Sequence, residues 1–280
     1  MPLIDGKLIA RNILGDLSQR VKKLKQRGSV PLLAVILVGN DKPSLTYVKK
    51  KGEAAKKVGI GFTLHHLPPD ATEREVLSTL ERVQSDPALS GLIVQLPLPR
   101  HLDTEKILSH IHPEYDVDCL TPLCIAQLES GNPTFIPPTP GAILSILESL
   151  HVQLNGARVA VFGRGPLVGK PIATLLRQAG AEVEVIHSKT ENPQAISRSA
   201  DIVISGIGKK IVTGDMIREG AIVIDAGTLV EDGAVSGDVD IASVEPKAAF
   251  VTPTPGGVGP ITVARLLWNT VLGAERRTKG

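Results

Sequence analysis

The sequence predicts an α/β fold with two domains, and three observations support this prediction. Short runs rich in β-branched residues recur along the chain, and a helical pattern follows each run. Near-continuous apolar runs of this kind are typical of parallel strands that are covered on both faces. Two segments rich in proline and glycine divide the 280 residues, which suffice for two cores of ordinary size.

The expected strands form two groups, one in each half of the chain. They are residues 32–38, 62–67, 91–95, 158–162, 182–186, 201–204 and 221–224. A helix is expected over 44–58 and another over about 262–275, the latter beginning at Thr262. The first break, residues 131–141, holds four prolines, which cannot continue a helix or a central strand. Residues 252–260 form the second break.

Composition and charge exclude several classes of function. Aromatic residues make up only 2% of the chain, and 31 Lys and Arg balance 29 Asp and Glu, so we expect no nucleic acid partner. The longest apolar runs are far below the roughly 20 residues of a membrane span, and no signal peptide is evident. Only two cysteines are present, Cys119 and Cys124. We therefore expect buried free thiols, no metal site and a cytoplasmic location.

A glycine-rich turn follows the strand expected over 158–162. Residues 163–169 have the pattern G-x-G-x-x-x-G, one residue longer than the commonest dinucleotide fingerprint. Such a turn lets backbone N–H groups approach a pyrophosphate at the N-terminus of a helix. The alternative is a tight turn without a ligand.

The end of the following strand indicates which dinucleotide binds. Enzymes that use NAD usually place Asp or Glu there, to bind the ribose 2′-OH. This strand ends in Ile186-His187-Ser188-Lys189-Thr190 and carries no acid, while Arg164 lies in the glycine-rich turn. Arg164, Ser188 and Lys189 suit a 2′-phosphate, so we predict NADP rather than NAD. The alternative is that Lys189 and Thr190 are solvated loop residues.

Lys51 lies on the apolar face of the helix expected over 44–58. At about 100° per residue, one arc of this helix collects apolar side chains, namely Tyr47, Val48, Ala54, Ala55 and Val58. Lys51 falls within that arc, one turn after Tyr47. Either the lysine extends to solvent, or it is partly buried, with a lowered pKa that suits proton transfer.

Two further polar segments stand out. Gln95 ends an apolar strand, which is where α/β proteins bind ligands, although it can instead satisfy local loop backbone. In Asp116-Val117-Asp118 both carboxylates point to one face of an extended segment. Ligand binding and turn capping are comparable interpretations of this pair, and metal binding is the weakest.

Together, six motifs resemble those of the bifunctional methylenetetrahydrofolate dehydrogenase/methenyltetrahydrofolate cyclohydrolase family, over nearly the whole chain. In chain order they are Tyr47-x-x-x-Lys51 with Gly59-Ile60, Val94 to Pro99, Asp116-Val117-Asp118, Pro137 to Gly141, Gly163-Arg164 through Pro171, and Pro253 to Thr262. Each motif is modest alone, but six in this order are highly specific.

The resemblance implies the reaction and the domain plan. Residues 1–138 with 260–280 would form a folate-binding catalytic domain, and residues 139–259 a Rossmann-like NADP-binding domain, with a cleft between them. 5,10-Methylenetetrahydrofolate would lose hydride to NADP, and hydrolysis of the methenyl product would give 10-formyltetrahydrofolate. The family also implies a homodimer and a place in the one-carbon metabolism that serves purine biosynthesis.

The resemblance also implies roles for particular residues. Lys51 would handle the protons of hydrolysis, Gln95 would hydrogen-bond and tune it, and Asp118 would hold the pterin ring. The substrate would further contact Tyr47, Pro255, Gly256 and Gly257. The cofactor contacts would be Gly163, Arg164, Gly165, Val168, Gly169, Ser188, Gly206 and Ile207.

The sequence departs from the family pattern at several positions. Tyr115, Cys119, Cys124 and Ala126 replace a basic residue, a glycine, an asparagine and a glycine, while Gly165 and Lys210 replace a serine and a proline. The missing serine predicts weaker NADP binding or a shift toward NAD. A monofunctional dehydrogenase is one alternative, against which the presence of Lys51 and Gln95 argues. Two further hypotheses remain. One is a non-catalytic nucleotide-binding regulator. The other is a dehydrogenase of a small hydroxy or amino acid, which would want an arginine clamp that we do not find.

Overall fold

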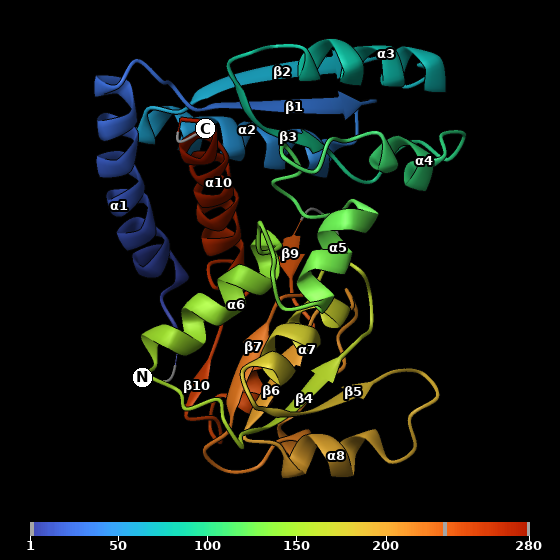
Figure 1. Cartoon of the computed structure of the whole chain (residues 1–280). Helices are drawn as coiled ribbons and strands as arrows, with labels where there is room; N and C mark the ends of the chain where they lie inside the picture. Colours follow the sequence, from blue (N-terminus) through green and yellow to red (C-terminus); the bar gives the residue numbers. More distant parts are fainter. Residues whose placement is uncertain (1–2, 232–233, 279–280) are drawn as a thin grey trace. The chain divides into compact units, whose positions relative to one another are not determined.

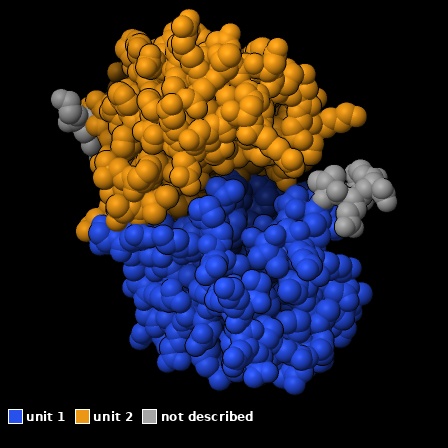
Figure 2. All heavy atoms as spheres, turned by 90° about the vertical axis from the view of Figure 1, so that its right-hand side faces the viewer, with its two compact units in different colours: residues 1–10, 128–131, 139–262 blue, residues 11–127, 132–138, 263–280 orange. Residues whose placement is uncertain are grey.

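The structure is a computed structural model that describes residues 3–231 and 234–278. The chain divides into two compact units (Figure 2). Unit 1 comprises residues 1–10, 128–131 and 139–262, and unit 2 comprises residues 11–127, 132–138 and 263–280. Each unit has its own parallel sheet, so the predicted two-domain α/β fold is confirmed. Within the described ranges, no helix is both long and apolar enough to span a membrane.

Unit 2 is built on a parallel sheet with strand order β2-β1-β3. Its strands are β1 (Leu32–Val38), β2 (Gly61–Leu67) and β3 (Leu89–Val94). Apolar side chains of α1 (Gly6–Gln26), α2 (Lys42–Val58) and α10 (Val258–Arg277) pack on one face, and those of α3 (Glu73–Gln84) and α4 (Thr104–Ser109) pack on the other (Figure 1). Alternate residues of β1 therefore enter two separate cores, which explains why the strand is apolar throughout.

Unit 1 contains a parallel sheet with strand order β10-β7-β6-β4-β5. Its strands are β4 (Arg158–Phe162), β5 (Glu182–Ile186), β6 (Ile202–Ser205), β7 (Ile222–Asp225) and β10 (Phe250–Val251). Its helices are α6 (Pro138–Ser149), α7 (Gly169–Gln178), α8 (Pro193–Ser199) and α9 (Ile241–Val244). Because β5 and β6 lie on opposite sides of β4, the strand order reverses there, and ligands bind such sheets at the carboxyl ends of the strands beside that point.

All seven predicted strands are present, each within two residues of its expected bounds. The short β10 and the antiparallel pair β8 (Leu229–Glu231) and β9 (Ala234–Ser236) were not predicted. Strands of two or three residues are too short to show a period in the sequence.

Two expected helix starts and the expected end of the proline-rich break differ from the structure. The helix α6 begins at Pro138, so the proline-rich break ends earlier than expected, because prolines in the first helical turn cost no hydrogen bond. Likewise α10 begins at Val258, and Thr262 lies inside it, donating to Val258 O at 3.2 Å. The cap of α2 is Asp41, whose carboxylate accepts the Ser44 N–H at 2.9 Å.

Residues 1–10 and 128–131 cluster with unit 1, although the sequence interpretation placed them in the folate domain. Two hydrogen bonds explain this grouping. The Ile4 N–H donates to Val251 O at 2.9 Å, and Gln178 Nε2 donates to Leu128 O at 2.8 Å.

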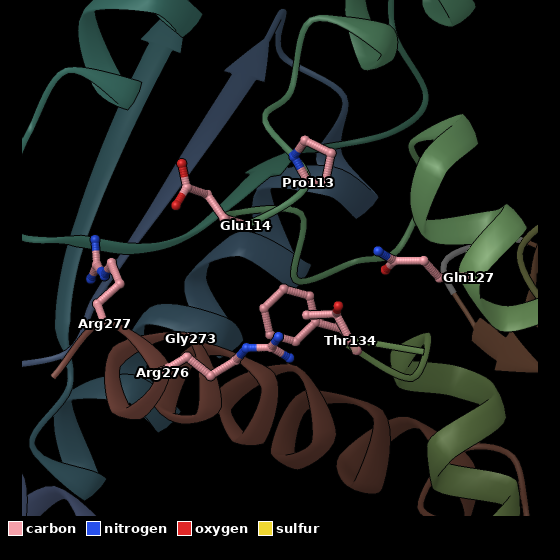
Figure 3. Close-up of a pocket in the computed structure, with 8 residues that line it drawn as sticks. Pro113, Glu114, Gln127, Thr134, Gly273, Arg276 and Arg277 are labelled. Atoms are coloured by element: carbon pink, nitrogen blue, oxygen red, sulfur yellow. The ribbon is translucent and has the colours of Figure 1, made fainter. Parts of the chain in front are cut away.

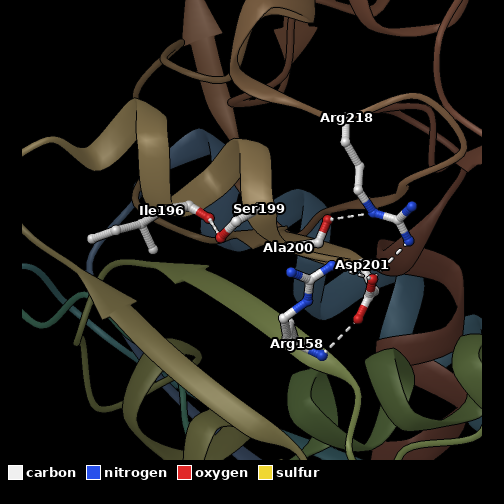
Figure 4. A network of polar contacts seen from close by, with 6 residues as sticks. All are labelled: Arg158, Ile196, Ser199, Ala200, Asp201 and Arg218. Atoms are coloured by element: carbon white, nitrogen blue, oxygen red, sulfur yellow. Dashed lines mark hydrogen bonds and ion pairs between the residues drawn. The ribbon is translucent and has the colours of Figure 1, made fainter.

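In unit 1, a polar network around Asp201 links the amino-terminal ends of the strands β4 and β6 (Figure 4). Its carboxylate accepts the Arg158 N–H at 2.8 Å and pairs with the guanidinium groups of Arg158 and Arg218 at 3.3 and 2.7 Å. These side chains are partly exposed, so each ion pair contributes only about 1 kcal/mol or less. The network orders the amino-terminal ends of these strands, whereas the predicted cofactor site lies at their carboxyl ends.

Candidate active site

Lys51 and Gln95 lie side by side in unit 2. Lys51 projects from the third turn of α2, and Gln95 directly follows the last residue of β3. Lys51 Nζ donates to Gln95 Oε1 at 3.0 Å, and Gln95 Nε2 donates to Leu96 O at 2.7 Å. The second hydrogen bond fixes the orientation of the amide, so that its oxygen faces the amine of Lys51.

Burial acts on the protonation of Lys51 and Asp118 in opposite directions. Both side chains are half-buried. Burial lowers the pKa of Lys51 by disfavouring its charged form, and the Asp118 carboxylate partly opposes this shift. Burial raises the pKa of Asp118; Lys51 counteracts that rise and Asp116 adds to it. The two pKa values are therefore closer together than in ordinary side chains, and Lys51 can lose its proton more easily.

The two carboxylates of the 116–118 segment have different environments. Asp116 is fully buried and accepts the N–H groups of Leu120 at 3.1 Å and Thr121 at 2.7 Å, which lie just before α5 (Pro122–Glu129). Asp116 therefore caps a turn, whereas the Asp118 carboxylate acts on the pKa of Lys51. The metal interpretation of this pair has no structural support, because Asp116 is engaged by backbone donors.

Two residues without a predicted role position the 116–118 segment, one from α10 and one from β3. Asn269 on α10 is buried, and its Nδ2 donates to Val117 O and Ile136 O, each at 2.8 Å. A Cβ added to Gly91 would lie 2.6 Å from a methyl group of Val117. An isolated glycine inside a strand signals such close approach, and that signal was available in the sequence. Nothing local in the sequence could reveal the contacts of Asn269.

Tyr47 lies one turn before Lys51 on α2, and its side chain is 38% exposed. The helical arc predicted an apolar position, but Tyr47 stands near the edge of that arc, where burial ends. The Lys50 amine lies 5.8 Å from the centre of its ring. An exposed aromatic ring so near Lys51 along the helix offers a stacking surface for a planar ligand.

The thiols at the departures Cys119 and Cys124 hydrogen-bond to backbone carbonyls. Cys119 has a φ of 62°, a left-handed conformation that favours glycine. Its Sγ donates to Phe135 O at 3.0 Å, and Cys124 Sγ donates to Pro113 O at 3.7 Å. Both thiols are free and buried, as predicted.

Pro113 and Phe135 also line a cavity of about 340 Å³ in unit 2 (Figure 3). Arg276 and Arg277 of α10 line the same cavity, and Arg277 donates to Ser90 Oγ at 2.8 Å. None of the predicted site residues lines it. The cavity is therefore separate from the Lys51 site.

In unit 1, the turn after β4 requires glycine at two positions. Gly163 has a φ of 97°, and a Cβ there would lie 2.4 Å from Ile207 Cγ2. A Cβ on Gly169, the first residue of α7, would lie 2.1 Å from Gly163 O. Gly165 differs, because a Cβ there would have no atom within 4 Å. Gly163 and Gly169 therefore fit the roles of glycines in a dinucleotide turn, which are a tight turn and close packing of the helix.

The loop after β6 packs on this turn. A Cβ on Gly206 would lie 2.7 Å from Val168 Cγ1, and Ile207 contacts Gly163. The structure thus brings together predicted cofactor residues from two segments. They lie at the carboxyl ends of the neighbouring strands β4 and β6, beside the reversal of strand order.

The side chains predicted to bind the 2′-phosphate are exposed. Arg164 lies in the turn after β4, and Ser188 and Lys189 follow β5. The Thr190 hydroxyl accepts the His187 N–H at 2.9 Å, so Thr190 serves the local turn, as the alternative interpretation held for this residue. A guanidinium, a hydroxyl and an ammonium, without a carboxylate at the end of β5, fit the chemistry of NADP.

The predicted substrate loop of Pro255, Gly256 and Gly257 lies in unit 1, just before α10. Gly256 has a φ of 111°, and a Cβ on Gly257 would lie 2.6 Å from Pro253 O. A Cβ on Gly6 would lie 1.8 Å from Gly257 O, so the start of α1 packs tightly on this loop. The folate residues in unit 2 and this loop therefore belong to different units.

A dinucleotide-type turn in one unit and a half-buried lysine with a lowered pKa in the other are features of a two-domain, nicotinamide-dependent enzyme. Two family profiles match the chain. They are the tetrahydrofolate dehydrogenase/cyclohydrolase catalytic domain over residues 4–118 and the tetrahydrofolate dehydrogenase/cyclohydrolase NAD(P)-binding domain over residues 137–278. The chain belongs to the tetrahydrofolate dehydrogenase/cyclohydrolase family.

Similarity to individual proteins extends over the full length. The bifunctional protein FolD of Nautilia profundicola is 45% identical over 281 residues, covering 100% of this chain and 99% of that protein. The methylenetetrahydrofolate dehydrogenase-cyclohydrolase of Trypanosoma brucei, solved with NADP cofactor and an inhibitor, is 39% identical with a TM-score of 0.96, covering 99% and 98% of the two chains. The Campylobacter jejuni enzyme is 38% identical with a TM-score of 0.95, covering 98% and 99%. The predicted family is confirmed.

Proposed function

We propose that the chain works as a bifunctional enzyme in which Lys51, Gln95 and Asp118 serve the hydrolytic step. It oxidises 5,10-methylenetetrahydrofolate to 5,10-methenyltetrahydrofolate with NADP and hydrolyses that product to 10-formyltetrahydrofolate. The full-length similarity to bifunctional relatives supports both activities. The assignment of these residues rests on the hydrogen bond of 3.0 Å between Lys51 Nζ and Gln95 Oε1. The pKa of this lysine is lowered by burial.

Hydrolysis needs a base that is not permanently charged. Neutral Lys51 accepts a proton from water as the water oxygen bonds to the methenyl carbon. Lys51 then gives that proton to N5 as the bond between the carbon and N5 breaks. The remaining hydroxyl proton leaves to solvent as the formyl C=O forms, so one proton is released per turnover. A lysine with a lowered pKa suits this exchange, because it releases its proton more readily than an ordinary lysine does.

Gln95 suits Lys51 because its amide is neutral. The amide oxygen orients the amine without favouring the charged ammonium form as strongly as a carboxylate would. Asp118 is the proposed acceptor of paired N–H donors from the aminopyrimidine edge of the pterin, because a carboxylate accepts such paired donors on its two oxygens.

The Gln95→Glu variant is expected to shift the pH dependence of hydrolysis. A carboxylate about 3 Å from Nζ favours the ammonium form, so it raises the pKa of Lys51. Since the neutral amine is the active form, the rate rises with pH and levels off above that pKa. The wild-type inflection should lie below that of an ordinary lysine, and Gln95→Glu should move it to higher pH. The measurement is a pH–rate profile on methenyltetrahydrofolate, corrected for uncatalysed hydrolysis.

The neutral variant Gln95→Leu is the control for this profile. It removes the acceptor without adding charge, so the rate should fall while the inflection does not move upward. An inflection that is the same in Gln95→Glu and wild type would contradict the role of Lys51 as the titrating base.

Oxidation requires alignment rather than acid–base chemistry. NADP, when bound, accepts the hydride of the methylene carbon. We propose that unit 1 holds the cofactor through the turn of residues 163–169 and the loop at Gly206 and Ile207. Arg164 and Ser188 are the proposed contacts of the 2′-phosphate, and the loop of residues 255–257 is the proposed contact of substrate and nicotinamide. Folate is proposed to bind in unit 2, beside Tyr47 and Asp118.

The Arg164→Gln variant is expected to bind NADP about tenfold more weakly and NAD unchanged, because it loses a cation that only the 2′-phosphate needs. Titration of each dinucleotide, followed by fluorescence, measures both dissociation constants. Lys189→Gln beside it tests whether that lysine is a solvated loop residue, in which case neither constant changes. An equal loss of NADP and NAD in Arg164→Gln would contradict the assignment.

A paired spectrophotometric assay tests the proposed function. Purified protein receives methylenetetrahydrofolate with NADP or NAD and, separately, methenyltetrahydrofolate alone. We expect turnover of both substrates, with NADP preferred. A protein that binds NADP but turns over neither substrate would support the regulator hypothesis, with the departures between Tyr115 and Ala126 as its cause.

The quaternary structure and location of the protein are also proposals. We propose a homodimer, on the strength of the family resemblance, and sedimentation analysis at micromolar concentration tests it. We propose a reducing location such as the cytoplasm, which the free thiols Cys119 and Cys124 support. Fractionation of cells, followed by immunodetection, tests that location.

A further inference from the structure

Asp238 is a fully buried carboxylate that binds three donors of one loop in unit 1. It follows the β8–β9 pair along the chain. Its Oδ2 accepts the Ser205 hydroxyl at 2.6 Å and the Ile207 N–H at 2.7 Å, and its Oδ1 accepts the Lys209 N–H at 2.8 Å. All three donors belong to residues 205–209, at and just after the end of β6. A single side chain therefore determines the path of this loop.

A second buried carboxylate, Asp225 at the end of β7, holds Asp238 in place. Its Oδ1 accepts the Asp238 N–H at 3.1 Å, and its Oδ2 accepts the Val239 N–H at 3.1 Å. Burial raises the pKa of Asp225 to about 6, against the lowering effect of these backbone donors. The two carboxylates thus form one connected, buried network.

The backbone is fitted closely around both carboxylates. A Cβ on Gly227 would lie 2.0 Å from Asp238 Oδ1, and a Cβ on Gly237 would lie 1.9 Å from Asp225 Oδ2. Each carboxylate therefore lies against a glycine of the other segment. Neither segment can shift without displacing the carboxylate that orders residues 205–209.

We propose that Asp238 is a positioning residue for the cofactor, which sets the loop of residues 205–209 against the glycine-rich turn. The proposal rests on the proposed role of Gly206 and Ile207 in binding NADP. Ile207 contacts Gly163, and Gly206 lies against Val168, so the position of the loop decides the shape of the cofactor surface. A carboxylate accepts hydrogen bonds on both oxygens, whereas an asparagine would direct an NH₂ group at one of the loop donors.

The test is Asp238→Asn in the full chain, with three measurements. They are the dissociation constant of NADP, the KM for NADP against kcat in oxidation, and the hydrolysis of methenyltetrahydrofolate without cofactor. We expect the dissociation constant and KM for NADP to rise about tenfold or more, as for a lost hydrogen bond to a charged group. Hydrolysis should be unchanged, because Lys51 and Gln95 lie in unit 2 and the assay contains no NADP.

Asp240→Asn is the matched control, because Asp240 is two residues away and its carboxylate lies 3.8 Å from Lys210 at the surface. It should leave NADP binding unchanged. Ser205→Ala removes one donor and keeps both carboxylates, so it should raise the dissociation constant of NADP by a smaller factor. This variant tests the proposal if Asp238→Asn fails to fold. If Asp238→Asn folds and binds NADP as the wild type does, the proposal is overturned. If Asp238→Asn does not fold, unchanged NADP binding in Ser205→Ala overturns it. A failure of the proposed function would instead appear in the wild type, as NADP binding without turnover of either folate.

Discussion

Replacing Lys51 with methionine is expected to abolish hydrolysis of methenyltetrahydrofolate while oxidation of methylenetetrahydrofolate continues. Methionine keeps an unbranched side chain of similar reach, so the packing of α2 is preserved, but it cannot accept a proton. Positioned general bases contribute roughly 10²–10⁴-fold to rate, so hydrolysis should fall by about that factor. Oxidation should change little, because hydride transfer needs no base. The two assays on one preparation measure both effects.

The control for this variant is Lys50→Met. Lys50 precedes Lys51 on the same helix and is exposed. The loss of a positive charge is thus the same, but no proton-transfer group is removed, and both activities should remain. Hydrolysis by Lys51→Met at a rate close to wild type would contradict the mechanism, and parallel loss of both activities would indicate misfolding or lost folate binding.

The Gly169→Ala variant is expected to have the opposite effect. The added Cβ would lie 2.1 Å from Gly163 O and 3.1 Å from Arg164 N, so the turn that approaches the cofactor must move. Displacements of about 1 Å can reduce reaction rates by about 10²-fold, and a loss of that order is expected in kcat/KM for oxidation. Hydrolysis should continue, because the altered residue lies in unit 1 and Lys51 lies in unit 2.

Gly165→Ala is the control for this second variant. It adds the same methyl group to the same turn, four residues earlier, where no atom lies within 4 Å. The turn should therefore keep its conformation, and NADP binding should change far less than in Gly169→Ala. If both alanine variants oxidise methylenetetrahydrofolate at the wild-type rate, the turn does not bind the cofactor as proposed. Loss of hydrolysis but not of oxidation in Gly169→Ala would contradict the division of roles between the units.

The two variants together separate the activities. Lys51→Met should yield a dehydrogenase without hydrolysis, and Gly169→Ala a cyclohydrolase with impaired oxidation. Both outcomes depend on residues of one unit serving one step. A regulator that merely binds nucleotide would show neither activity in the wild type.

Much of the fold was predictable because its signals are local. The strands β1, β3, β4 and β6 are buried along almost their whole length, so they read as continuous apolar runs. The glycine-rich turn is recognisable because its conformation excludes side chains at Gly163 and Gly169. The period of one helix placed Lys51 on the apolar arc, but it left open whether the lysine is partly buried or extends to solvent. The helix starts at Pro138 and Val258 were missed, because prolines in a first helical turn resemble a break.

The sequence by itself determined the order of the strands and helices, the dinucleotide turn and the position of Lys51 on its helix, because these depend on periods of two to four residues. Only the tertiary structure decided which side chains meet. Lys51 and Gln95 are 44 residues apart in sequence, Asn269 and Val117 are 152 apart, and Asp238 and Ser205 are 33 apart. It also separated Asp116, which caps a turn, from Asp118, which interacts with Lys51. Such contacts depend on strand register and helix packing across the whole unit, and no local pattern encodes them.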